Sequence, residues 1–133
     1  MTPTETVTEF IARINQRDPS RLAELLTDDH IFIDSIGNTV KGRDNMAAAW
    51  GQYFAFCPDY QVTAESILAD GEQVAVIGTA GGTIAQNGTT PPENHWNIRA
   101  AFFALVRHDH IQQWRVYADN KPVYDILARI KST

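Results

Sequence analysis

The feature that most constrains the fold of this 133-residue chain is a run of four strand-like segments in its second half. In the first and the last of these segments apolar and polar side chains alternate, which is typical of strands with one buried face. The turns Asp70-Gly71 and His108-Asp109 and a turn-rich loop at residues 86–94 connect them. Connections this short join antiparallel neighbours, so the second half predicts an antiparallel sheet. The four segments are residues 60–69, 73–85, 95–107 and 110–119.

The first half predicts three helices and one strand. Thr2 is placed to cap the first helix, with Pro3 at its first position and Glu5 completing a capping box. Its buried face is expected to carry Val7, Phe10, Ile11 and Ile14. A short second helix is expected to start at Asp18-Pro19, with Leu22, Leu25 and Leu26 buried.

A strand is expected at residues 30–36, followed by a turn at Gly37-Asn38. The third helix is predicted over residues 43–56, and Pro58 stops it. The apolar stripe of this helix consists of Met46, Trp50, Tyr53 and Phe54. A closing helix is expected to bury Val123, Ile126, Leu127 and Ile130.

The element order α-α-β-α-β-β-β-β-α predicts one α+β domain over residues 1–133, with helices packed on one face of a curved sheet. Gly78, Gly81 and Gly82 lie within one predicted strand, where glycine is costly unless the strand bends. A strongly bent sheet around a helix would leave a cavity between them.

Composition excludes several classes of function. The net charge is −5 and there is no basic block, so nucleic-acid binding is not expected. Cys57 is the only cysteine, which excludes an internal disulfide or a thiolate metal cluster. The N-terminus lacks the pattern of a signal peptide, and the longest apolar run, residues 100–106, is too short to span a membrane. We therefore expect a cytoplasmic protein with no membrane partner.

Two aspartates that end apolar runs are the candidate catalytic residues. Asp34 follows Ile31-Phe32-Ile33, and Asp119 ends the segment 114–119. In apolar surroundings a carboxylate loses hydration and its pKa rises, which suits acid–base catalysis near neutral pH. Each aspartate also has a local alternative: Asp119 would cap the last helix, and Asp34 would close a side-chain turn. Both alternatives stay open at this point.

Three segments of the chain resemble the NTF2-like superfamily, and most of all its SnoaL-like polyketide cyclase and ketosteroid isomerase-like branch. They are residues 25–34 (LLTDDHIFID), 40–46 (VKGRDNM) and 111–119 (IQQWRVYAD). The resemblance implies a cone-shaped α+β half-barrel, a small hydrophobic ligand and a homodimer formed through the sheet. No metal and no organic cofactor are expected, since the sequence contains no phosphate-binding loop and no ligand cluster.

The resemblance also implies candidate roles. Asp119 matches the acid–base aspartate of the cyclases, and Asp34 matches the base of the ketosteroid isomerases, with a small hydrophobic carbonyl compound as substrate. The isomerases' oxyanion donors are missing, because the first helix offers Phe10 where they have a tyrosine. An epoxide hydrolase of the limonene type would use Arg99 with Asp119, but Ala101 stands where its second aspartate belongs. That hydrolase and a non-catalytic ligand-binding or dimerisation module remain the alternatives.

Alternation along the last strand separates a polar face from an apolar one. We expect the polar set to line the pocket and the apolar set to form the dimer contact. The polar set is Gln113, Arg115, Tyr117 and Asp119, and the apolar set is Trp114, Val116 and Ala118. The candidate substrate contacts are Tyr53, Trp50, Arg99, Tyr117 and His95.

Overall fold

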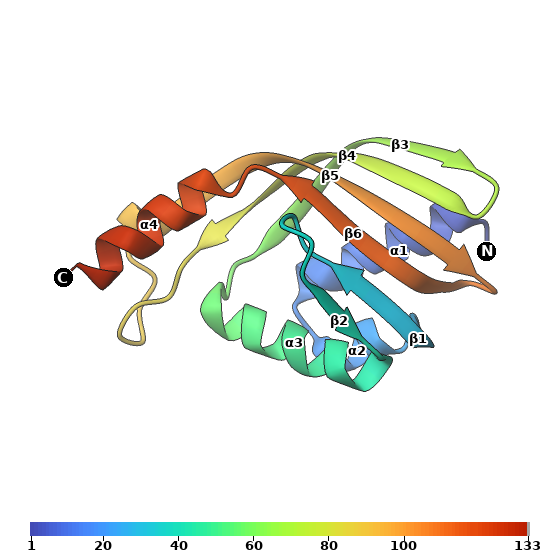
Figure 1. Cartoon of the computed structure of the whole chain (residues 1–133), viewed down its shortest axis with the longest axis horizontal. Coiled ribbons are helices and arrows are strands. Elements are labelled where there is room, and N and C mark those ends of the chain that lie inside the picture. The colour runs from blue at the N-terminus through green and yellow to red at the C-terminus, as the bar shows by residue number, and fades with distance from the viewer. Residues whose placement is uncertain (133) are drawn as a thin grey trace.

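Six strands form one curved sheet, and the helices α1, α2 and α3 lie on its concave side (Figure 1). The structure is a computed structural model, and it describes residues 1–132. Its helices are α1 (Pro3–Gln16), α2 (Pro19–Ala23), α3 (Arg43–Phe56), the 3-10 turn η1 (Pro92–Asn94) and α4 (Lys121–Lys131). Its strands are β1 (Leu26–Ile33), β2 (Thr39–Lys41), β3 (Gln61–Asp70), β4 (Gln73–Thr83), β5 (His95–Arg107) and β6 (His110–Ala118). The α+β class with helices on one face of a bent sheet is therefore confirmed.

The strand order in the sheet is β2-β1-β6-β5-β4-β3. The last four strands form the antiparallel series that their short connections predict. β1 pairs in parallel with β6, which carries the N-terminal half of the chain across to the middle of the sheet. The cavity described below lies beneath this junction.

α1 supplies the helical side of the core. The predicted capping box is present: the Glu5 amide donates to Thr2 Oγ1 at 3.1 Å, and the Thr2 amide donates to Glu5 Oε1 at 2.8 Å. Phe10 is fully buried, and its ring meets that of Trp114 on β6 edge to face, with the ring centroids 4.9 Å apart. This contact fixes α1 against the concave face of the sheet.

The region between α1 and α3 differs from the prediction. The second helix ends at Ala23, so the buried Leu26 belongs to β1, which begins there and not at His30. β1 is irregular between Leu26 and Ile31, and the exposed Asp28 and Asp29 lie in that stretch. β2 was not predicted, because three residues are too short to show an alternating pattern.

The glycines of β4 allow other segments to approach its backbone closely. A Cβ atom at Gly78 would collide with the carbonyl of Thr63, next to a bulge in β3 between Ala64 and Ser66. A Cβ atom at Gly82 would collide with Sγ of Cys57. These contacts occur where the sheet arches over the helices (Figure 1).

The closing helix α4 lies at the end of the sheet, beside the loop that precedes β5 (Figure 1). Arg129 donates to Oδ1 of the buried Asn94 at 2.7 Å and to the carbonyl of Glu93 at 2.9 Å. None of the helices within residues 1–132 has the length and apolar character needed to cross a membrane.

Candidate functional site

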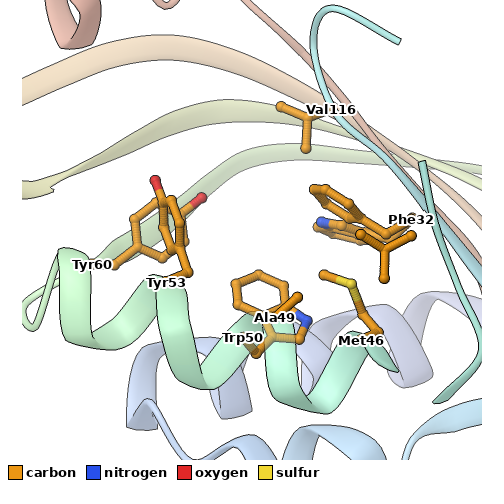
Figure 2. A pocket seen from close by; sticks show the side chains of 9 residues that line it. Phe32, Met46, Ala49, Trp50, Tyr53, Tyr60 and Val116 are labelled. Atoms are coloured by element: carbon orange, nitrogen blue, oxygen red, sulfur yellow. The ribbon is translucent and has the colours of Figure 1, made fainter. Parts of the chain in front are cut away.

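An apolar cavity of about 160 Å³ lies between α3 and the concave face of the sheet (Figure 2). Helix α3 contributes Met46, Ala49, Trp50 and Tyr53 to its lining. Strands β1, β2 and β6 contribute Phe32, Val40, Trp114 and Val116, and Tyr60 closes one end.

Helical spacing explains why α3 presents this wall. Its four lining residues recur at three- and four-residue intervals, which places them on one face of the helix. Trp50, which is only 5 % exposed, is the centre of this wall. Its ring stacks on Phe54 at a centroid distance of 5.3 Å and meets Phe32 at 6.4 Å.

Two tyrosines stand side by side at one end of the cavity. The rings of Tyr53 and Tyr60 meet edge to face with centroids 4.9 Å apart, and Figure 2 shows their oxygen atoms directed away from α3. Within residues 1–132 neither hydroxyl has a hydrogen-bond partner. Burial raises the pKa of both phenols above their usual value, so both stay neutral hydrogen-bond donors at ordinary pH.

Three hydrogen bonds join the C-terminal end of α1 to the start of β3 and hold Tyr60 in place. Asn15 Nδ2 donates to the carbonyl of Val62 at 2.9 Å, and the Val62 amide donates back to Asn15 Oδ1 at 2.8 Å. Arg17 donates to the carbonyl of Tyr60 itself at 3.1 Å. The start of β3 is thereby tied to α1, and the Tyr60 ring is aimed at α3.

The cavity wall carries no ionisable group other than the two phenols. The nearby Cys57 is fully buried, and burial raises the pKa of its thiol to about 12, so it remains an unreactive thiol. The wall can therefore enclose an apolar molecule and donate hydrogen bonds to it. No side chain of the wall changes its protonation state near neutral pH.

Asp34 and Asp119 lie outside this wall. Oδ1 of Asp34 accepts hydrogen bonds from the amides of Ile36 at 3.0 Å and Asn38 at 2.9 Å, which makes it a turn residue. Oδ1 of the exposed Asp119 accepts from the amide of Lys121 at 3.0 Å, at the start of α4. Asp34 therefore takes the local alternative that the sequence left open, whereas Asp119 bonds the first amide of α4 but is not its cap, because the N-cap residue is Asn120. Their catalytic roles stay predictions.

The structure nevertheless brings the two aspartate segments together. Asn120 Nδ2 donates to Ser35 Oγ at 2.6 Å, so the residues that follow the two aspartates are in direct contact. Asp119 lies in a shallow groove on the outer face of the sheet with Arg99 and Tyr117.

The expected assignment of the two faces of β6 is wrong. Trp114, 1 % exposed, and Val116 line the cavity, whereas Tyr117 is 51 % exposed on the outer face. Cζ of Arg115 lies 5.2 Å from the Tyr117 ring centroid on that same outer face. The apolar set turns inward because α1 covers the concave face and excludes water from it.

The candidate substrate contacts separate into two groups. Trp50 and Tyr53 line the cavity. Arg99 is an exposed outer-face residue that donates to both carboxylate oxygens of Glu65, at 2.6 and 2.8 Å, and it is not paired with Asp119. His95 lies in a second, polar groove together with Asp59.

Sequence reasoning missed most of the cavity wall. Tyr60 stands just outside a strand, and nothing in the local pattern pairs it with Tyr53. For Trp114 a signal did exist, because a tryptophan that alternates with polar residues is far more often buried than exposed on a sheet face.

Comparison with known proteins identifies the family. The family described as "SnoaL-like domain" matches residues 7–114. No curated protein matches the chain.

Solved structures share the fold. A protein of ketosteroid isomerase-like fold from Catenulispora acidiphila, solved in complex with trimethylamine, is 24 % identical, with 92 % of this chain and 91 % of that chain covered and a TM-score of 0.79. IdmH from Streptomyces antibioticus, a candidate polyketide cyclase, is 23 % identical over 96 % and 99 % of the two chains, with a TM-score of 0.78. An LEH-like epoxide hydrolase from M. tuberculosis is 18 % identical over 98 % of this chain and 92 % of that chain, also with a TM-score of 0.78. At these identities the likeness shows the fold alone.

Proposed function

Because the chain belongs to the SnoaL-like domain family, we propose that it binds a small apolar molecule carrying a hydrogen-bond acceptor, such as a carbonyl oxygen. One observation carries this proposal. The hydroxyls of Tyr53 and Tyr60 are the polar groups at one end of an otherwise apolar cavity, and within residues 1–132 they have no partner. A ligand acceptor placed between them would receive both hydrogen bonds, while its apolar part would meet Trp50 and Trp114.

The size of the cavity limits the ligand. A dry, apolar cavity of roughly 150 Å³ in another protein holds one benzene molecule. The cavity here is about 160 Å³, so it supports a ligand with a single six-membered ring and one acceptor group.

The wall supports binding more than acid–base catalysis. Catalysis by Asp119 with Asp34 would require a carboxylate at the reacting atoms, and both carboxylates accept hydrogen bonds from turn or cap amides outside the wall. Hydrolysis of an epoxide would need Arg99, which is engaged with Glu65 on the other face of the sheet. We therefore propose the ligand-binding module ahead of the cyclase, isomerase and hydrolase hypotheses.

A second ligand class, a small methylated ammonium ion, is also supported. Five aromatic rings line the cavity, and such a cage attracts methylated ammonium groups through the faces of its rings. The Catenulispora acidiphila protein of the same fold was solved with trimethylamine. The rings are those of Phe32, Trp50, Tyr53, Tyr60 and Trp114.

An NMR titration distinguishes these ligands. The Met46 and Val116 methyl signals report on opposite walls of the cavity, and the probes are cyclohexanone, its isostere methylenecyclohexane and tetramethylammonium. Tighter binding of cyclohexanone than of methylenecyclohexane supports the carbonyl class, and saturable binding of tetramethylammonium alone supports the ammonium class. If none of the three shifts these signals in a saturable way, the proposed function is wrong.

Matched variants test the two hydroxyls. Each of Tyr53→Phe and Tyr60→Phe should weaken cyclohexanone binding by roughly three- to tenfold, because one neutral hydrogen bond is lost, and should leave methylenecyclohexane binding unchanged. Tyr117→Phe is the control, because Tyr117 is exposed on the opposite face. Equal losses for the ketone and the hydrocarbon would show that the hydroxyls do not bind the acceptor.

The homodimer also stays a proposal, and the structure changes the residues that would form it. The outer face of β3, β4 and β6 exposes Leu68, Ile77 and Tyr117, which are 61 %, 44 % and 51 % exposed. Pairing two copies through this face would remove these apolar side chains from water. Sedimentation of wild type and Ile77→Glu tests it: a dimer that the variant converts to a monomer is expected, and a monomeric wild type would contradict the proposal.

A further inference from the structure

A polar groove of about 370 Å³ lies on the other face of the sheet, where β3 begins and β5 begins. His95 and Asn97 point into it from β5, since Trp96 and Ile98, which alternate with them, are buried in the core. Asp59 and Gln61 line the opposite wall of the groove. They are the residues directly before and after Tyr60, which faces inward to the apolar cavity. The groove is therefore separate from the apolar cavity.

A chain of hydrogen bonds holds the His95 ring. Asp59 accepts from the Thr83 amide at 2.6 Å with Oδ1 and from the Thr83 hydroxyl at 2.8 Å with Oδ2. Burial raises the pKa of the Asp59 carboxyl, but the hydrogen bonds from Thr83 outweigh this and hold its pKa below its usual range. Asp59 is thus ionised at neutral pH and can only accept.

This chain assigns the tautomer of His95. The Thr83 hydroxyl has a single proton, which it donates to Asp59, so it can only accept from Nδ1 of His95, 3.0 Å away. Nδ1 therefore carries a proton. Nε2 of the neutral ring is left as a free hydrogen-bond acceptor.

The remaining groups of the groove favour an uncharged ligand. The side chains of Gln61, Asn97 and Thr79 have no hydrogen-bond partner within residues 1–132, and each can both donate and accept. No lysine or arginine lines the groove to hold an anion. Both oxygens of Asp59 are already occupied, so they are poorly placed to bind a cation.

We propose that this groove is a second binding site, for a small neutral molecule rich in hydroxyl groups, such as a polyol or a monosaccharide, with one hydroxyl donating to Nε2 of His95. Thr83 and Asp59 act as positioning residues, because the Thr83 hydroxyl, held by Asp59, fixes the ring and its tautomer. Asn97 and Gln61 exchange hydrogen bonds with further hydroxyls.

The test is an NMR titration with myo-inositol as the probe. Saturable shifts of the His95 ring and of the Asn97 and Gln61 side-chain amides are expected, with a dissociation constant in the millimolar range. His95→Ala should weaken binding at least roughly threefold, as expected for one lost hydrogen bond. His110→Ala is the matched control, because His110 also bonds through Nδ1, to the carbonyl of His108 at 2.7 Å, but lies outside the groove.

The positioning role has its own measurement. The ¹⁵N shifts of the His95 ring should show a protonated Nδ1 in wild type and in Thr83→Ser, and a mixture of tautomers in Thr83→Val. Binding of myo-inositol should fall in Thr83→Val and recover in Thr83→Ser. The proposal is overturned if the shifts never saturate, if His95→Ala binds as well as wild type, or if the ring shows the opposite tautomer in wild type.

Discussion

The contact between Gly82 and Cys57 gives the sharpest prediction about stability, and it bears on both sites. The turn from Cys57 to Tyr60 places Tyr60 in the cavity and Asp59 in the polar groove. In Gly82→Ala the new Cβ would collide with Cys57 Sγ and lie 3.1 Å from Asp59 Oδ1 and 3.2 Å from Cα of Tyr60. Overpacking of this kind lowers the free energy of unfolding by about 1–3 kcal/mol. We expect about 3 kcal/mol for Gly82→Ala, because one of the close atoms is the backbone Cα of Tyr60.

A double-mutant cycle isolates the contact. Cys57→Ala removes the colliding Sγ at a cost of about 1 kcal/mol, because a small buried group is lost. The double variant Gly82→Ala/Cys57→Ala should cost about 2 kcal/mol, whereas the costs of the two single variants add up to about 4 kcal/mol. The difference of about 2 kcal/mol is the coupling energy between the two residues.

Denaturant unfolding followed by tryptophan fluorescence measures these free energies. In a thermal melt of a domain of this size, each kcal/mol of lost stability corresponds to a decrease in Tm of about 3–5 °C. Gly51→Ala in α3 is the matched control, because its Cβ would be 3.8 Å from Pro19 Cγ, an ordinary contact, and alanine favours the helix by up to about 1 kcal/mol. Strictly additive costs for Gly82→Ala and Cys57→Ala would refute the packing argument.

Three further predictions concern the helix cap, a buried histidine and the aspartates. Thr2→Ala should lower the free energy of unfolding by about 0.5–2 kcal/mol through loss of the capping box, whereas Thr8→Ala, on the exposed side of α1, should change it by less than about 0.5 kcal/mol in thermal melts. Burial lowers the pKa of His30, so the unfolded chain binds its proton first and stability should fall as the pH drops below about 6.5. Urea titrations of wild type and His30→Gln between pH 7.5 and 5 check this, and an equally steep fall in the variant would exclude His30 as the cause. Asp119→Asn and Asp34→Asn should leave cyclohexanone binding within about twofold of wild type, because neither carboxylate lines the cavity, and a larger loss in the same titration would place it at the ligand.

The sequence predicted best the elements with strong boundaries and long patterns. α3 runs from Arg43 to Phe56 as expected, between Gly42 and Pro58. β5 covers His95–Arg107 as expected, because the turn-rich loop at residues 86–94 and the turn His108-Asp109 bound it on both sides. The start of β1 and the short β2 were missed, because an irregular strand and a three-residue strand carry little periodic signal.

The site was harder to predict because it depends on contacts between distant segments. Alternation separates the two faces of β6, but the packing of α1 and α3 decides which face is inside. The hydrogen bonds that occupy Asp34 come from the turn amides that follow it, and an apolar run before the residue does not reveal them. Tyr60 reaches Tyr53 only because α1 holds the start of β3 and Gly82 admits Cys57.

The most direct test of the account is an intermolecular NOE spectrum of the protein with cyclohexanone bound. The proposed function predicts NOEs from the ligand methylene protons to the Met46 and Val116 methyl groups and to the Tyr53 ring. NOEs only to Leu68 or Ile77, on the outer face of the sheet, would contradict it and place the ligand outside the cavity.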